Sequence, residues 1–378
     1  MSTAVQKLGM PKWGLSMTEG RLIAWLVDEG AEIAVGDEVA EVETEKINGA
    51  VEAPVAGVLR RRVAAEGDVI PVGGLLGVVA EAGVPDADVD AFIAEFQASF
   101  VPGESEEDAG PQPETATVGA GTLRFIRHEG DGDAEPLVLL HGFGGDLNNW
   151  LFNTEALAAG RTVYALDLPG HGGSVKLVGD GDAAGLAATV REFLDGQGVG
   201  RAHLAGHSMG ALVAAELALS EPERVASLTL IAPAGLGGEI DREYVDGFVA
   251  ATGRRDLKPV LQRLFADPDL VTRQMVDDVL KYKRLDGVQD ALRTLAGRLF
   301  PNGRQARVVA GELEGGYGGP VLVIWGERDA IIPPAQAEAA PDRAEAHVLP
   351  GVGHSPHMEA AGDVNRLLEG FLAGVRAG

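Results

Sequence analysis

A serine in a glycine-rich turn is the first residue of this chain that could do covalent chemistry. Ser208 is the central residue of GHSMG at 206–210, after an apolar segment at 203–206 that predicts a strand and before a helical pattern at 211–219. A serine at such a sharp turn adopts a strained backbone that exposes its hydroxyl, and the flanking glycines let strand and helix approach closely. The chain has no cysteine, so a thiol nucleophile is excluded. We therefore expect Ser208 to attack an acyl carbonyl carbon.

A lysine near the N-terminus could carry a covalently attached group. Lys46 lies in ETEKI at 43–47, between predicted strands at 39–43 and 51–53. We therefore expect a tight hairpin over 44–49 with Lys46 at its exposed tip. A solvated turn lysine without a function is the ordinary alternative for such a residue.

The sequence around this lysine is repeated. Residues 20–42 share their glycine and branched apolar positions with residues 57–79, always 37 positions later. Two copies of a short strand-rich unit with glycine turns predict a pseudo-twofold β domain over 1–81. This domain resembles the lipoyl domains of 2-oxo acid dehydrogenase complexes, and the resemblance implies lipoate joined to the Lys46 amine through an amide. Biotin carriers share the fold, but their lysine usually lies between two methionines, so lipoate is favoured.

Composition and charge restrict the partners. The chain has 378 residues and a net charge of −26, with 31 Lys and Arg against 57 Asp and Glu, which opposes binding to nucleic-acid phosphates. Its start has no basic segment followed by an apolar run, and no apolar stretch is long enough to span a membrane. We therefore expect a cytoplasmic protein with neither nucleic-acid nor membrane partners.

The segment 82–120 is expected to connect the β domain to a second domain. Residues 63–123 contain twelve acidic residues and no Lys or Arg. Apolar residues at helical spacing predict a short amphipathic helix over 86–100, which we expect to pack onto the C-terminal half. Residues 102–117, PGESEEDAGPQPETAT, have no apolar periodicity and predict an extended linker.

From about residue 121 the pattern alternates between buried strands and helices. Strands are predicted at 123–127, 137–140, 162–166, 203–206, 228–232, 321–325 and 346–349, with helices that include 183–194, 211–219 and 364–372. Such alternation predicts a doubly wound, mostly parallel sheet. The stretch 239–315 contains helical segments alone. We expect it to form a lid over the carboxyl ends of the strands, where such sheets bind ligands.

The region 121–378 resembles the α/β-hydrolase superfamily on the GHSMG turn and on further motifs in the same order. The resemblance implies that the backbone N–H groups of Phe143, in HGFGG, and Met209 form an oxyanion hole. It also implies that Asp329, in GERD, orients His354, in GHSP, and that His354 is the general base for the serine.

Alternatives remain for several of these roles. His357 is a rival base three residues after His354, and Asp167 or Glu327 could replace Asp329. No group of His, Asp or Glu has metal-ligand spacing, so we expect no catalytic metal. The other motif histidines are expected to hydrogen-bond loops: His141, His171 and His207.

Over its whole length the chain resembles the acetyltransferase component (dihydrolipoyllysine-residue acetyltransferase) of bacterial acetoin dehydrogenase complexes. The resemblance implies a multidomain protein: an all-β lipoyl domain of the barrel-sandwich hybrid type at 1–81, a linker at 82–120 and an α/β-hydrolase-fold catalytic domain at 121–378. The acetyl group would pass from the lipoyl arm on Lys46 to coenzyme A, through an acylated Ser208. The implied partners are a thiamin-diphosphate-dependent acetoin-cleaving component and dihydrolipoyl dehydrogenase, around a homo-oligomer or complex core.

The chain departs from ordinary lipoyl acyltransferases, because it lacks their His-x-x-x-Asp-Gly motif. If acetyl-coenzyme A is formed, either the hydrolase-like half catalyses the transfer or the transfer takes place without it. Cations in the lid are candidates for the anionic end of coenzyme A, with solvated helix faces as the alternative: Arg254, Arg255, Lys258, Lys281, Lys283 and Arg284. Two other functions stay open: a hydrolase of an ester, a thioester or a C–C bond fused to a carrier, and a carrier subunit whose C-terminal half is a scaffold.

Overall fold

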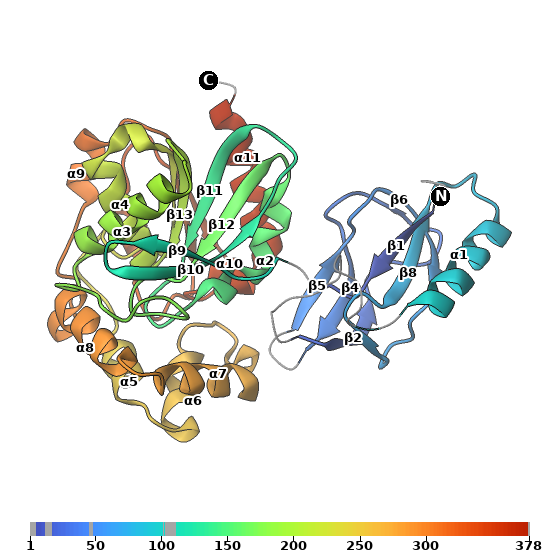
Figure 1. Cartoon of the computed structure of the whole chain (residues 1–378), viewed down its shortest axis with the longest axis horizontal. Helices are drawn as coiled ribbons and strands as arrows, with labels where there is room; N and C mark the ends of the chain where they lie inside the picture. The colour runs from blue at the N-terminus through green and yellow to red at the C-terminus, as the bar shows by residue number, and fades with distance from the viewer. Residues whose placement is uncertain (1–4, 12–16, 45–47, 101, 103–110, 377–378) are drawn as a thin grey trace. The chain divides into compact units, whose positions relative to one another are not determined.

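The chain divides into two compact units, Met1–Gln112 and Pro113–Gly378 (Figure 1). The computed structural model describes residues 5–11, 17–44, 48–100, 102 and 111–376. Within these ranges no helix has both the length and the apolar character needed to cross a lipid bilayer.

The first unit consists of two four-stranded sheets, with strand orders β1-β8-β6-β3 and β5-β4-β2-β7. Strands β2, β3 and β4 recur 37 residues later as β6, β7 and β8, each in the opposite sheet, as the sequence repeat predicts. The repeat pairs Leu22 with Leu59 and Val42 with Val79, and all four side chains are buried. The strands are Val5–Gly9 (β1), Glu19–Trp25 (β2), Glu32–Ile33 (β3), Glu38–Glu43 (β4), Asn48–Glu52 (β5), Gly57–Arg62 (β6), Val69–Pro71 (β7) and Leu75–Ala80 (β8).

The strands expected on either side of the candidate carrier lysine are present, although the second begins at Asn48 rather than at residue 51. Strands β4 and β5 pair antiparallel, with Glu43 opposite Asn48. Lys46 itself lies outside the described residues, so its attachment role stays a prediction.

Helix α1 (Asp86–Ser99) packs on the first unit, so our expectation that it docks on the C-terminal half is wrong. Its fully buried Val89 meets Leu75 and Val78 of β8, and Phe92, Ile93 and Phe96 pack against the same cluster. Two arginines of β6 hold its first turns, through Arg60 Nη2 to Asp86 Oδ1 at 2.6 Å and Arg61 Nε to Asp90 Oδ1 at 3.1 Å. The β-domain therefore supplies both the apolar and the charged partners of the helix.

The second unit is built on an eight-stranded sheet with the order β16-β15-β14-β13-β11-β12-β10-β9. Strands β11 to β16 are parallel, while β9 and β10 form an antiparallel edge. Helices cover both faces, with α3, α4 and α9 on one and α2, α10 and α11 on the other (Figure 1). The strands are Glu114–Val118 (β9), Gly121–His128 (β10), Ala134–Leu140 (β11), Arg161–Leu166 (β12), Ala202–His207 (β13), Val225–Ile231 (β14), Val321–Gly326 (β15) and Glu345–Leu349 (β16); the helices are Leu151–Thr154 (α2), Ala183–Gly196 (α3), Met209–Ser220 (α4), Ala310–Gly316 (α9), Pro356–Glu359 (α10) and Ala361–Arg376 (α11).

The linker is shorter than the sequence suggested. We expected it to reach residue 120, but residues 114–118 form β9, which pairs with β10 at the sheet edge. Ala116 and Val118 face the core, while the residues between and before them are exposed. In this edge strand only two side chains alternate toward the core. Because the preceding sequence is acidic and rich in proline, this short alternation of apolar and polar residues was not recognised as a strand.

The lid consists of four helices inserted between β14 and β15: Arg242–Ala250 (α5), Arg254–Gln262 (α6), Arg273–Lys283 (α7) and Val288–Leu299 (α8). They lie together at one end of the second unit in Figure 1. Their buried apolar residues, which include Phe248, Leu257, Leu280 and Leu292, join the main core of this unit. The last helix of the expected insertion, α9, packs on α4 instead and belongs to the helical layer of the sheet.

Candidate active site

Ser208 occupies the sharp turn between β13 and α4. Its backbone has φ +52° and ψ −114°, a region that L-residues rarely adopt, and its N–H donates to the Ile231 carbonyl at 2.9 Å. A Cβ at Gly206 would lie 2.3 Å from the Gly210 oxygen, and a Cβ at Gly210 would lie 2.2 Å from the Leu140 oxygen. Neither glycine can therefore be replaced without moving the backbone, as the sequence motif predicts.

Asp329 follows β15, and its fully buried carboxylate accepts four hydrogen bonds. Oδ1 accepts the backbone N–H groups of Ile331 at 2.8 Å and Ile332 at 2.9 Å. Oδ2 accepts the Trp325 indole N–H at 2.9 Å and bonds His354 Nδ1 at 2.8 Å. These donors compensate the cost of removing a charged group from water and hold the carboxylate in one orientation.

His354 is buried in the loop after β16, and two contacts hold it. Its Nδ1 bonds Asp329, and its Nε2 has no hydrogen-bond partner among the described residues. Its backbone oxygen accepts the His207 Nε2 proton at 2.8 Å, with the two rings 4.8 Å apart. Because His207 directly precedes Ser208, this bond ties the serine turn to the histidine loop.

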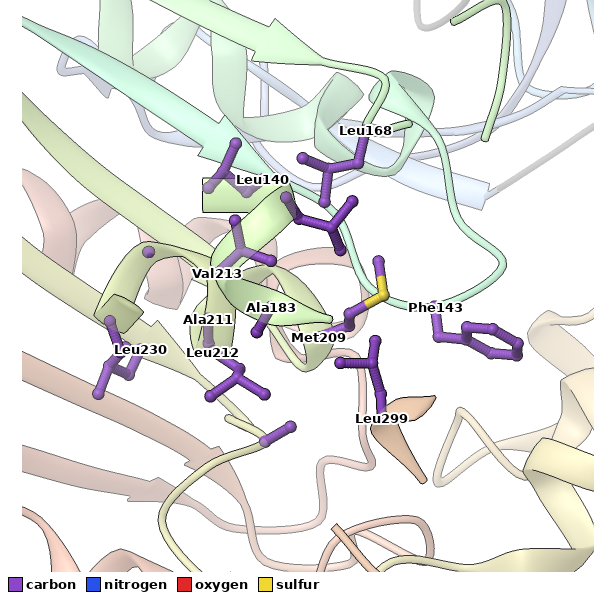
Figure 2. Packing of buried hydrophobic residues seen from close by; sticks show 14 of the residues in the cluster. Leu140, Phe143, Leu168, Ala183, Met209, Ala211, Leu212, Val213, Leu230 and Leu299 are labelled. Carbon is purple, nitrogen blue, oxygen red and sulfur yellow. The ribbon is translucent and has the colours of Figure 1, made fainter. Parts of the chain in front are cut away.

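The two residues expected to form the oxyanion hole are both held by the core of the second unit. Figure 2 shows Phe143 and Met209 in one apolar cluster with Leu140, Leu168 and Leu299. Neither backbone N–H has a hydrogen-bond partner among the described residues, and Met209 is the first residue of α4. Two free N–H groups of this kind can stabilise a developing negative charge.

The rival residues have other roles. The Asp167 carboxylate accepts the backbone N–H groups of Leu147 and Gly173 and forms an ion pair with Arg124. The Glu327 side chain is exposed, and its carboxylate accepts the Gly351 N–H. His357 is buried between the rings of Trp150 and His207, with both ring centroids 4.5 Å away, and bonds no carboxylate in the described structure. Burial lowers the pKa of His357 to about 3, so it stays neutral.

The remaining motif histidines bond loops, as expected. His141 Nε2 accepts the Leu168 N–H at 2.9 Å, and His171 Nε2 accepts the Gly144 N–H at 3.1 Å. Burial lowers the pKa of His141 to about 4. These neutral rings fix the two loops that carry Phe143 and Leu168.

A pocket of about 80 Å³ lies between the Phe143 loop and the lid. Its loop side contains Gly142, Phe143 and His357, and its lid side is apolar. The lid residues are Tyr244, Phe248, Leu261, Leu264, Phe265, Met275 and Val279. The lid thus supplies a mostly apolar wall next to the serine turn.

The six candidate cations of the lid differ in their exposure to solvent. Lys283 is buried, and its ammonium donates to the Phe248 and Val249 carbonyls at the end of α5, so it cannot reach a solvent anion and our expectation for it is wrong. Burial lowers its pKa to about 8. The other five candidates are exposed, and Arg254 pairs with Asp277.

Sequence reasoning missed the positioning role of Trp325, and it predicted that His207 bonds a loop without identifying that loop as the one that carries His354. Trp325 is the fifth residue of an apolar strand and looks like a core residue, while His207 looks like a loop ligand. Only their contacts with Asp329 and His354, far away in the sequence, reveal their part in the site.

Family models match both units. The alpha/beta hydrolase fold model matches residues 135–361, and the model described as biotin-requiring enzyme matches residues 6–79. The fold predicted for each part of the chain is confirmed.

Relatives align with most or all of the chain. A dihydrolipoyllysine-residue acetyltransferase component of an acetoin cleaving system from Pseudomonas putida is 53% identical over 97% of this chain and 98% of its own length. The component of that name from Cupriavidus necator is 50% identical over 99% of both chains. A 2-hydroxy-6-oxononadienedioate/2-hydroxy-6-oxononatrienedioate hydrolase from Paraburkholderia xenovorans is 32% identical over 68% of this chain and 98% of its own. The chain therefore belongs to the family of dihydrolipoyllysine-residue acetyltransferase components of acetoin cleaving systems.

Proposed function

We propose that the chain transfers an acetyl group from a lipoyl arm on Lys46 to coenzyme A, with Ser208 as the intermediate acyl acceptor. One observation carries the proposal: a single chain joins a lipoyl-type carrier unit to a serine turn that is tied to a hydrogen-bonded Asp329–His354 pair. Carriers deliver acyl groups as thioesters, and a serine with a base transfers them.

The carrier unit fits lipoate. The antiparallel pairing of Glu43 with Asn48 leaves residues 44–47 to connect the two strands, and Lys46 is the amine-bearing residue among them. When bound there through an amide and reduced to its dithiol form, lipoate would supply a thiol that carries an acetyl group as a thioester. All further steps depend on residues of the second unit.

His354 and Ser208 perform the first half of the reaction. His354 Nε2 removes the Ser208 hydroxyl proton while Oγ attacks the carbonyl carbon of an acetyl thioester. The Phe143 and Met209 N–H groups stabilise the oxyanion, and Asp329 stabilises the imidazolium. The C–S bond then breaks, and His354 returns its proton to the departing thiolate.

The second half repeats these steps in reverse. The thiol of coenzyme A gives its proton to His354 and attacks the acetyl-serine carbonyl, and His354 protonates Ser208 Oγ as the ester bond breaks. Water competes with the thiol at this point. The apolar lid wall of the pocket, which includes Phe248 and Met275, disfavours water and supports a transferase.

Within an acetoin cleaving system the chain would work with an acetoin-cleaving enzyme that uses thiamin diphosphate and with dihydrolipoyl dehydrogenase. We propose that copies of the chain form the core of this assembly. A cytoplasmic location stays a prediction.

A hydrolase is the second candidate, and the 32% identity to a hydrolase that covers the second unit favours it. A scaffold role is disfavoured, because a scaffold needs neither the strained Ser208 turn nor the four bonds to Asp329.

Following a labelled acetyl group tests the proposal. The lipoylated, reduced protein is loaded with labelled acetyl, coenzyme A is added, and the products are separated. We expect label in acetyl-coenzyme A, and its loss in Ser208→Ala. Label that appears as acetate at saturating coenzyme A identifies a hydrolase, and full transfer by Ser208→Ala rules out the serine intermediate.

A further inference from the structure

We propose that a surface pocket between the lid helices α6 and α7 binds the phosphate groups of coenzyme A, an inference that rests on the proposed function. This phosphate pocket has a volume of about 460 Å³ and is lined by Gly253 and Arg254 from the start of α6 and by Asp277, Leu280, Lys281 and Arg284 from α7 and its end. It is distinct from the apolar pocket beside the serine turn, because the two share no lining residue.

The charged groups of the phosphate pocket favour an anion. Three cations face one carboxylate, and that carboxylate, Asp277, is already bonded by Arg254, with Nη2 to Oδ2 at 2.7 Å. The Arg284 guanidinium has no hydrogen bond or ion pair with any described residue, and its backbone N–H caps the end of α7. The Lys281 ammonium has a single exposed contact, of 3.2 Å with Asp278. Two cations therefore remain available, and a guanidinium can bind two phosphate oxygens at once.

The backbone adds to this positive potential. Gly253 is the N-cap of α6 and has no side chain to bond the first N–H groups of the helix. The N–H groups of Arg254 and Arg255 have no partner in the described ranges. Free N–H groups at a helix start attract anions, and here they open beside three basic side chains.

This local charge is unusual for the chain. Its net charge is −26, so most of its surface repels phosphates, whereas residues 253–284 contain eight Lys and Arg against five Asp residues. A phosphate-bearing acceptor is attracted to this part of the lid and repelled elsewhere.

Helices α6 and α7 contribute to the lining of both pockets, which suits an acceptor whose thiol is far from its phosphates. Met275 and Val279 of α7 line the apolar pocket beside the serine turn, while Lys281 and Arg284 line the phosphate pocket. Arg284 follows Met275 by nine positions, about 14 Å along a helix axis. In coenzyme A the pantetheine arm bridges a separation of this kind, so phosphates bound at Arg284 leave the thiol free to enter beside the serine.

Kinetics with two acceptor thiols test this site. The lipoylated full-length protein and its Lys281→Gln, Arg284→Gln and double variants are assayed with coenzyme A and with pantetheine, which has no phosphate. We expect the KM for coenzyme A to rise about tenfold per substitution, with kcat unchanged and the KM for pantetheine unaffected. Arg293→Gln is the control, because Arg293 is an exposed lid arginine on α8 that pairs with Asp290. It should change neither KM.

The outcomes separate this inference from the proposed function. An unchanged KM for coenzyme A in the double variant, with acetyl-coenzyme A still formed, refutes the phosphate pocket and leaves the transferase intact. An equal rise for pantetheine also refutes it, since the lesion is then not specific for phosphate. If the wild type forms no acetyl-coenzyme A, the proposed function fails, and calorimetric titration with coenzyme A still decides the pocket. Binding that weakens in Arg284→Gln but not in Arg293→Gln supports it, and absence of binding to the wild type refutes it.

Discussion

Replacing Trp325 with phenylalanine tests whether the buried carboxylate of the site depends on its indole donor. The Trp325 N–H donates to Asp329 Oδ2 at 2.9 Å and to the Ile332 carbonyl at 3.2 Å, and Trp325→Phe removes both bonds. A hydrogen bond to a charged acceptor contributes about 1.5–3 kcal/mol and one to a carbonyl about 1 kcal/mol. Because the single N–H is shared between the two acceptors, Trp325→Phe should cost about 2 kcal/mol of unfolding free energy beyond the effect of the smaller side chain. It should also lower kcat about tenfold, because the carboxylate that orients His354 loses one of four donors.

The chain contains a matched control. Trp150 is equally buried in the same unit, but its indole N–H has no partner among the described residues. Trp150→Phe removes the same atoms without a hydrogen bond, so the difference between the two variants isolates the Trp325 bonds. Urea unfolding followed by far-ultraviolet circular dichroism gives the stabilities, and acetyl transfer gives kcat. Equal losses of stability in both variants, or full kcat in Trp325→Phe, would refute the reasoning.

Three further outcomes are expected. His354→Gln should lower kcat by about 10²–10⁴ because the proposed general base is lost, whereas His357→Gln should stay within a few-fold of wild type; the reverse order in acetyl-transfer assays would make His357 the base. Gly210→Ala should abolish transfer and lower the melting temperature, since its Cβ would lie 2.2 Å from the Leu140 oxygen, and an active, stable variant would contradict this geometry. Burial lowers the pKa of folded Lys283 to about 8 from its ordinary 10.5. The unfolded state therefore binds more protons between these values, and the unfolding free energy should rise from pH 8 to 9.5 by at most about 1.4 kcal/mol per pH unit. The same urea titrations of Lys283→Met should show no such rise, and equal slopes in both proteins would disprove the assignment.

The predictable parts of the molecule are those specified by short sequence patterns. The GHSMG turn follows from local sterics, since only glycine at 206 and 210 avoids backbone clashes. The doubled β unit is visible because strands such as β4 and β8 repeat with a fixed offset. The roles of Ser208, Asp329 and His354 were instead implied by the resemblance of their motifs, and of the order of those motifs, to the α/β-hydrolase superfamily.

The unpredictable parts depend on partners distant in the sequence. Helix α1 has an apolar stripe that either half of the chain could have covered, and β8 covers it. Strand β9 has two buried residues in an otherwise acidic segment, which is too weak a pattern to identify. Lys283 is basic and belongs to an ordinary helical pattern, yet its ammonium is buried and donates to the backbone carbonyls of Phe248 and Val249, 35 and 34 residues earlier in the chain.

The left-handed backbone conformation of Ser208 affects which residue evolution keeps at this position. Its φ of +52° costs about 1–3 kcal/mol for a residue with a Cβ, while a glycine would adopt this conformation freely. Selection for stability alone would therefore favour glycine at this position, and the proposed catalytic role of Ser208 would account for the retention of the serine. We expect a library of variants ranked by thermal resistance to enrich glycine at position 208, so stability and activity must be selected separately.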